Sequence, residues 1–90
     1  MPSQEILITN QRGLHARASA KFVTMASKLP EELKITVAKD GSQVNGDSIM
    51  GLMMLGAARG DHVTVNVEGE DAEIYLKKLV GLIKDGFGED

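Results

Sequence analysis

The segment Gly13-Leu14-His15-Ala16-Arg17 places an imidazole and a guanidinium at the start of a stretch with helical periodicity. The first backbone N–H groups of a helix have no intrahelical partner, and the helix dipole there is equivalent to roughly half a positive charge. Such a position binds phosphate readily. Because His15 is also a nucleophile, the phosphate could be bonded to it rather than only bound beside it. The segment therefore predicts a phosphohistidine.

Length and composition limit the structure that can position this histidine. The chain has 90 residues, 42% of them hydrophobic, and no cysteine. We expect a single domain over residues 1–90 that is stabilised by packing alone, without disulfides. The Gly-rich stretch 86–90 is expected to be a frayed tail.

The charge balance and the hydropathy pattern narrow the class of partner. The net charge is −3 and aromatic residues make up 3% of the chain, whereas nucleic-acid modules need a basic surface and aromatic stacking platforms. The start of the chain lacks a basic segment followed by an apolar run, and no stretch approaches the ~20 apolar residues of a membrane span. We therefore expect a cytoplasmic protein without membrane insertion, whose partners are proteins. The two histidines and scattered carboxylates have no metal-site spacing.

Alternation of apolar and polar residues predicts four strands, each with one buried side. The clearest is His62–Glu68, where valines occupy every second position. The dipeptide Asp40-Gly41 predicts a hairpin turn between two others. The predicted strands cover residues 5–9, 33–38, 43–45 and 62–68.

Three segments with helical spacing should cover this sheet: Ala16–Lys28, Ser48–Ala57 and Asp71–Lys84. In the first, Phe22 lies on the apolar stripe and Ser19 lies off it. The last should end at Gly86. The order predicts an α+β fold, an open-faced βαββαβα sandwich with a four-stranded antiparallel sheet and three helices on one face.

The middle helix is apolar nearly all round, which is unusual for a surface helix. If its leucines face the sheet, Ile49, Met50 and Met53 form an exposed patch for binding partners, and methionines suit a surface that accepts several of them. The alternative is a helix that is buried on both sides.

Two separate motifs resemble the HPr family at matching positions along the chain: Gly13-Leu14-His15-Ala16-Arg17 and the run from Ser48 to Gly56. The resemblance implies the same fold, and it implies a phosphocarrier of the phosphoenolpyruvate-dependent phosphotransferase system rather than an enzyme. It further implies that enzyme I phosphorylates His15 on Nδ1 and that an enzyme IIA domain receives the phosphate. Arg17 and the backbone N–H groups of Ala16 and Arg17 would stabilise the phosphate, without cofactor or metal. A monomer that presents His15 openly is expected.

The resemblance leaves three points open. The position after the arginine is usually proline in HPr and is Ala18 here, which should loosen the site and puts the transfer rate in doubt. Ser48 is a natural helix N-cap, yet the matching serine in some HPr proteins is phosphorylated by HPr kinase/phosphorylase. The tail resembles NPr, the carrier of the nitrogen-related regulatory branch, so the sequence does not choose between that role and sugar transport.

Overall fold

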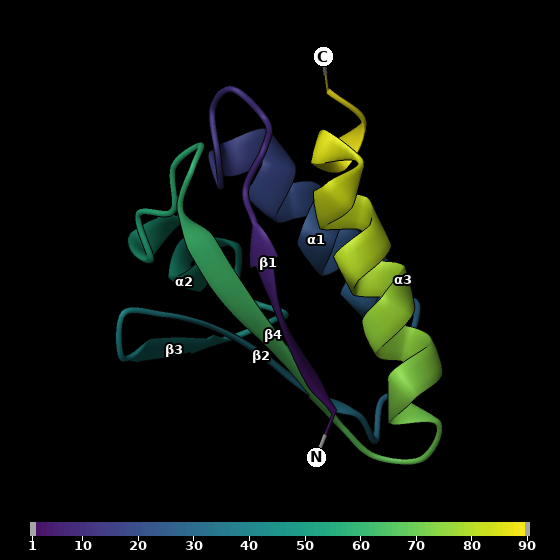
Figure 1. Cartoon of the computed structure of the whole chain (residues 1–90). Helices are drawn as coiled ribbons and strands as arrows, with labels where there is room; N and C mark the ends of the chain where they lie inside the picture. Colours follow the sequence, from purple (N-terminus) through teal and green to yellow (C-terminus); the bar gives the residue numbers. More distant parts are fainter. Residues whose placement is uncertain (1, 90) are drawn as a thin grey trace.

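The computed structural model describes residues 2–89 of the chain, and its elements follow the predicted βαββαβα order (Figure 1). A short 3-10 turn, η1, follows the third helix. The elements are β1 (Ser3–Leu7), α1 (Ala16–Ser27), β2 (Lys34–Lys39), β3 (Ser42–Asn45), α2 (Ile49–Met54), β4 (His62–Glu68), α3 (Ala72–Lys84) and η1 (Gly86–Gly88).

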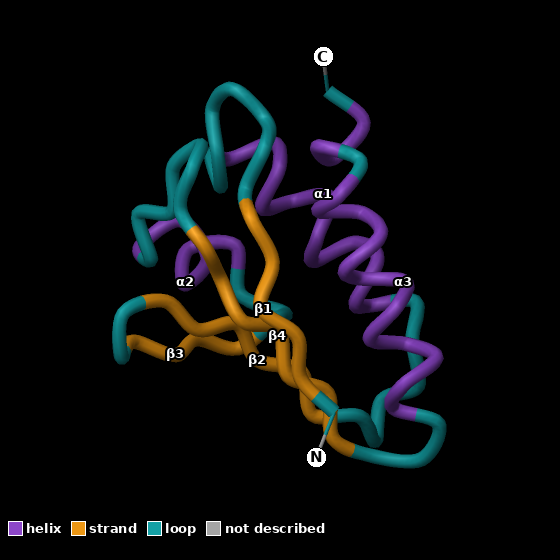
Figure 2. Tube along the Cα trace, in the orientation of Figure 1, coloured by secondary structure: helices purple, strands orange, loops and turns teal. Residues whose placement is uncertain are grey.

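The four strands form one antiparallel sheet in the order β1-β4-β2-β3. In the register Val63 opposes Ile6, and Val65 opposes Val37. These side chains are all buried, so the apolar face of the sheet is the one that the helices cover, while the other face stays open (Figure 2). The predicted fold class is confirmed. Within residues 2–89, no helix has the length and apolar character needed to cross a membrane.

The hairpin between β2 and β3 turns at the predicted dipeptide. Asp40 has φ +50° and Gly41 has φ +85°, so both central residues have the positive φ that a two-residue type I′ turn requires. The turn fixes the register in which Lys39 opposes Ser42. The periodicity and the turn residues therefore indicate the same pairing.

The helices bury the faces that their periodicity predicts, with one exception. Phe22 of α1 and Leu79 of α3 are completely buried. Ser19, expected off the apolar stripe of α1, is also completely buried, and its hydroxyl donates to the carbonyl of Leu14 at 3.2 Å. That expectation was wrong because α1 packs against both α2 and α3, which widens its buried face.

Element ends differ from the predicted ones by up to three residues. Strand β1 ends at Leu7, although the next residue, Ile8, remains completely buried and donates its N–H to the carbonyl of Asp61 at 2.8 Å. Helix α2 ends at Met54 rather than at residue 57, because Gly56 has φ +64° and cannot continue a right-handed helix.

The stretch after α3 is packed rather than frayed, which corrects the expectation for residues 86–89. Gly86, with φ +63°, follows the end of α3 as predicted. The chain then turns back, so that Phe87 is completely buried and its carbonyl accepts a hydrogen bond from Lys21 Nζ at 2.8 Å. Residue 90, also part of that expectation, lies outside the described residues. Figure 1 shows this yellow segment beside α1.

Candidate functional site

His15 follows a loop that is fixed by close contact with the connection between α2 and β4. The N–H of Leu14 donates to the carbonyl of Ala57 at 2.9 Å, and Asn10 Nδ2 donates to the carbonyl of Gly13 at 2.8 Å. Gly13 has φ +61°, and a Cβ at this position would overlap the Ala57 carbonyl oxygen and lie 2.8 Å from Ala58 Cα. Only glycine therefore permits the approach that places His15 at the start of α1.

His15 is the N-cap of α1, with extended backbone and a side chain that is 21% exposed. Its Nδ1 accepts a hydrogen bond from the backbone N–H of Arg17 at 3.3 Å, and its Nε2 lies 2.7 Å from Glu89 Oε2. An N–H can only donate and an ionised carboxylate can only accept. A neutral ring that satisfies both partners carries its proton on Nε2 and its lone pair on Nδ1.

The Glu89 carboxylate is held from both of its oxygens. Oε2 faces His15, and Oε1 accepts a hydrogen bond from Asn10 Nδ2 at 3.1 Å. Partial burial acts to raise the pKa of the Glu89 carboxyl, but the hydrogen bonds from Asn10 and His15, and the positive charge of Arg17 and of His15 when its ring is protonated, outweigh it. The pKa therefore lies below its ordinary value, so that the carboxylate is ionised at neutral pH.

Sequence reasoning missed Glu89 as a member of the site. The residue is 74 positions from His15 in the chain, and it stands in a Gly-rich stretch that has the composition of a loose tail. The family motif does not contain it. The only local signal is Phe87, because a large aromatic residue two positions earlier can anchor such a segment by burial.

Cationic side chains surround the open side of His15. Arg12, Arg17 and Lys21 line a surface hollow together with His15 and Glu89. Arg17 is exposed at the second position of α1, and the next residue, Ala18, which is the departure from the family pattern, is completely buried. A dianionic phosphoryl group on Nδ1 would meet the first-turn N–H groups of α1 and these positive charges. Within residues 2–89, no cluster of three metal-ligating side chains occurs.

Ser48 is the N-cap of α2, as its sequence context predicts. Its Oγ accepts a hydrogen bond from the N–H of Gly51 at 2.9 Å, and the residue is half-buried. The hydroxyl thus already contributes to stability, since an N-cap satisfies one of the unpaired first-turn N–H groups. Whether it is also phosphorylated stays a prediction.

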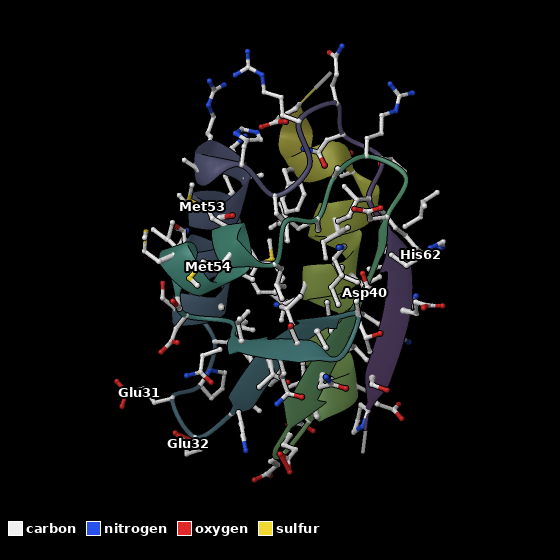
Figure 3. The ribbon with its side chains drawn as sticks, turned by 90° about the vertical axis from the view of Figure 1, so that its left-hand side faces the viewer. Glu31, Glu32, Asp40, Met53, Met54 and His62 are labelled. Carbon is white, nitrogen blue, oxygen red and sulfur yellow. The ribbon has the colours of Figure 1, made fainter. Side chains whose placement is uncertain are left out.

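The outer side of α2 is apolar and exposed, so the alternative of a helix buried on both sides is wrong. Met50 is 68% exposed, and Ile49 and Met53 are each 40% exposed, while Leu52 is buried against the sheet. Met54, 81% exposed, was missed, although it follows Met50 by four residues and so lies on the same face. Figure 3 shows Met53 and Met54 on the side of the molecule away from β1. We call Ile49, Met50, Met53 and Met54 the α2 patch.

The α2 patch and His15 lie on neighbouring elements, because α2 packs against α1. One partner surface can therefore cover the α2 patch while it reaches the N-terminus of α1. An open-faced α+β sandwich that presents a histidine in this way defines a phosphocarrier, a protein that holds a phosphoryl group between two partners.

The particular family follows from comparison with known proteins: residues 2–85 match the family model described as "PTS HPr component phosphorylation site", and the chain belongs to the HPr family. It is 47% identical to the phosphocarrier protein HPr of Neisseria meningitidis serogroup A, over 99% of this chain and 98% of that protein. HPr is a phosphocarrier of the phosphotransferase system and not an enzyme.

Solved structures agree with this assignment. A crystal structure of HPr from Thermoanaerobacter tengcongensis is 47% identical to this chain with a TM-score of 0.91, and the match covers 100% of this chain and 99% of that one. A second crystal structure from that organism, described as an HPr dimer, has the same identity, a TM-score of 0.75, and coverage of 99% and 100%. The predicted monomer is therefore unconfirmed.

Proposed function

We propose that His15 accepts a phosphoryl group from enzyme I on Nδ1 and passes it to an enzyme IIA domain. The observation that carries the proposal is the hydrogen-bonding of the imidazole. Nε2 lies 2.7 Å from the Glu89 carboxylate, while Nδ1 faces the N–H of Arg17 at 3.3 Å. This arrangement supports a ring whose nucleophilic lone pair points to the N-terminus of α1.

The transfer step needs no general base. The Nδ1 lone pair forms the bond to phosphorus, and the bond from phosphorus to its donor atom on enzyme I breaks, with the electron pair left on that atom. The proton on Nε2 stays where it is. The N–H of Arg17, released from Nδ1, and the N–H of Ala16 then hold phosphoryl oxygens, and the Arg17 guanidinium neutralises charge. Transfer to IIA is the same step in reverse, with a new acceptor.

The α2 patch is the surface proposed to bind these partners. Its exposed apolar side chains lie beside the element that carries His15, and exposed apolar patches are typical of protein-binding sites. Phosphorylation of Ser48 by HPr kinase/phosphorylase is proposed to regulate the binding. A phosphate there adds a charge of nearly −2 next to Ile49 and Met50, and Asp47 adds to the repulsion of an apolar partner.

We propose two roles for the carrier, which one measurement distinguishes. In the first, the chain works as a cytoplasmic monomer in sugar transport. In the second, it is an NPr-like carrier of the nitrogen-related branch. The discriminating measurement is the transfer rate from the phosphorylated chain to a sugar-specific IIA and to a nitrogen-type IIA, and the faster acceptor identifies the branch. Sedimentation at working concentration tests the monomer.

The experiment that tests the proposed function is intact-mass analysis after incubation with phosphoenolpyruvate and enzyme I. We expect one acid-labile, base-stable phosphate on the wild type and none on His15→Ala. His62→Ala is the matched control, since His62 is exposed on β4 and should leave acceptance unchanged. An unmodified wild type, with an enzyme I shown to be active on another HPr, would overturn the proposal. Incubation with HPr kinase/phosphorylase and ATP, with Ser48→Ala as control, tests the regulatory site.

A further inference from the structure

The segment after α3 reaches back across the molecule to the phosphoacceptor. Phe87 is completely buried, the Phe87 carbonyl is held by Lys21 Nζ at 2.8 Å, and Glu89 contacts both Asn10 and His15. These contacts anchor the segment at two points, one inside its 3-10 turn at Phe87 and one directly after it at Glu89. A carboxylate that is fixed in this way is part of the site's architecture.

We infer that Glu89 is a positioning residue for phosphoryl transfer, which holds the proton of His15 on Nε2 and thereby keeps the lone pair on Nδ1. The inference rests on the proposed role of His15. The 2.7 Å contact from Nε2 to Oε2 is short enough for a charge-assisted hydrogen bond, and the carboxylate cannot supply a proton to the ring. A neutral ring with its proton on Nδ1 would lose this bond and would clash with the Arg17 N–H.

The contact between Glu89 and Nε2 also makes Nδ1 of His15 a stronger nucleophile. A histidine whose N–H donates to a carboxylate is held in one tautomer and orientation, and its other nitrogen becomes a better electron-pair donor. In this chain that other nitrogen is the proposed nucleophile. The contact survives the reaction, because the new bond to phosphorus forms on Nδ1 and the Nε2 proton is not consumed, and the Glu89 carboxylate then balances the formal positive charge that the ring gains. Glu89 therefore serves both acceptance and release of the phosphoryl group.

Asn10 completes the arrangement by orienting Glu89. Its amide N–H₂ donates to Glu89 Oε1 and to the carbonyl of Gly13, so that one buried side chain joins the segment after α3 to the loop before His15. The carboxylate is thus aimed at the imidazole, and within residues 2–89 no ion pair joins it to Arg12, Arg17 or Lys21, the cations that line the same hollow. The positive groups remain available to the phosphate.

The test compares Glu89→Ala with Glu32→Ala in the full chain. Glu32 is exposed in the turn before β2, at the lower end of the molecule in Figure 3, and matches the change in charge and size. Nitrogen NMR of His15 in the unphosphorylated proteins measures the tautomer. We expect a single tautomer, protonated on Nε2, in the wild type and in Glu32→Ala, and a mixture in Glu89→Ala. Phosphate acceptance from enzyme I should slow about tenfold in Glu89→Ala only.

A second variant separates chemistry from docking. Glu89→Gln keeps an oxygen that can accept a hydrogen bond from the Nε2–H group, and we expect it to retain the wild-type tautomer. The ring signals of Phe87 report whether the segment stays packed. A Glu89→Ala protein with Phe87 packed, a wild-type tautomer and a wild-type rate would overturn the inference and leave the proposed function intact. A wild type that takes no phosphate would overturn the proposed function, and the tautomer measurement would still decide what Glu89 does to the ring.

Discussion

The close approach at Gly13 allows a quantitative prediction, because a second glycine, Gly56, has nearly the same φ but no neighbouring atom where a Cβ would lie. Gly13 has φ +61° and Gly56 has φ +64°, but a Cβ at residue 56 would meet nothing within 4 Å. Gly56→Ala therefore suffers only the cost of a left-handed L-residue, about 1 kcal/mol. Gly13→Ala suffers the same cost and also drives the Cβ into the backbone of residues 57 and 58.

That overlap cannot be relieved by rotating a side chain, so the loop before α1 must move. Overpacking of this kind costs about 2 kcal/mol beyond the conformational cost, which gives a total of about 3 kcal/mol for Gly13→Ala. In a domain of this size each kcal/mol lowers the melting temperature by roughly 4–8 °C. We therefore expect a fall of roughly 4–8 °C for Gly56→Ala and roughly 12–24 °C for Gly13→Ala.

Thermal unfolding followed by circular dichroism, and urea unfolding at 25 °C, measure both variants. The displaced loop also carries His15, so Gly13→Ala should accept phosphate more slowly than Gly56→Ala under conditions where both are folded. Equal stability of the two variants would refute the reasoning. It would mean that the approach of residue 13 to the Ala57 carbonyl is loose enough to accept a methyl group.

Three further predictions concern the side chains of Ser48, Met50 and Glu89. Ser48→Ala removes the α2 N-cap and should lower the free energy of unfolding by about 1 kcal/mol, whereas Ser48→Asp, which keeps a capping oxygen, should lower it by less; urea unfolding of both tests this. Met50→Glu should stay within about 0.5 kcal/mol of wild type because the residue is 68% exposed, yet accept phosphate from enzyme I more slowly. An unchanged rate would argue against the α2 patch as the binding surface. Because folding lowers the pKa of Glu89, the contact of its carboxylate with His15 stabilises the packed segment at neutral pH and is lost as the pH falls through that pKa. The NMR ring signals of Phe87 should therefore change with a midpoint below the ordinary pKa of 4.5. A midpoint above 4.5 would contradict the hydrogen bonds described for Glu89.

The sequence predicted most of the fold because local periodicity and the long-range contacts favour the same arrangement. Val63, Val65 and Val67 alternate along β4 and all face the core. The apolar stripe of α3 and the Asp40-Gly41 turn are equally local signals. Where the local pattern and the tertiary contacts disagree, prediction failed. Ser19 is polar, yet it is buried by packing on a second side of α1.

The candidate site was only partly predictable for the same reason. His15, Arg17 and the helix N-terminus are adjacent in sequence, and the residue types alone indicate their chemistry. Glu89 comes from a Gly-rich segment, and nothing near it in sequence indicates that the chain folds back to the start of α1. Met54 was within reach of the helical spacing. Ile49, Met50 and Met53 were assigned to the exposed face of α2, whereas Met54 was not.

The contact between His15 and Glu89 makes the order of folding matter for function. It joins residues 74 positions apart, with every strand of the sheet except β1 between them in the chain. A contact of such large sequence separation carries a loop-closure entropy, and it cannot form before the segment after α3 has been synthesised. A chain that has emerged from the ribosome only as far as α3 already contains the histidine, but the ring is still free to exchange its proton between the two nitrogens. On the proposed role of Glu89, the full rate of phosphoryl acceptance is therefore reached only when this last contact has closed.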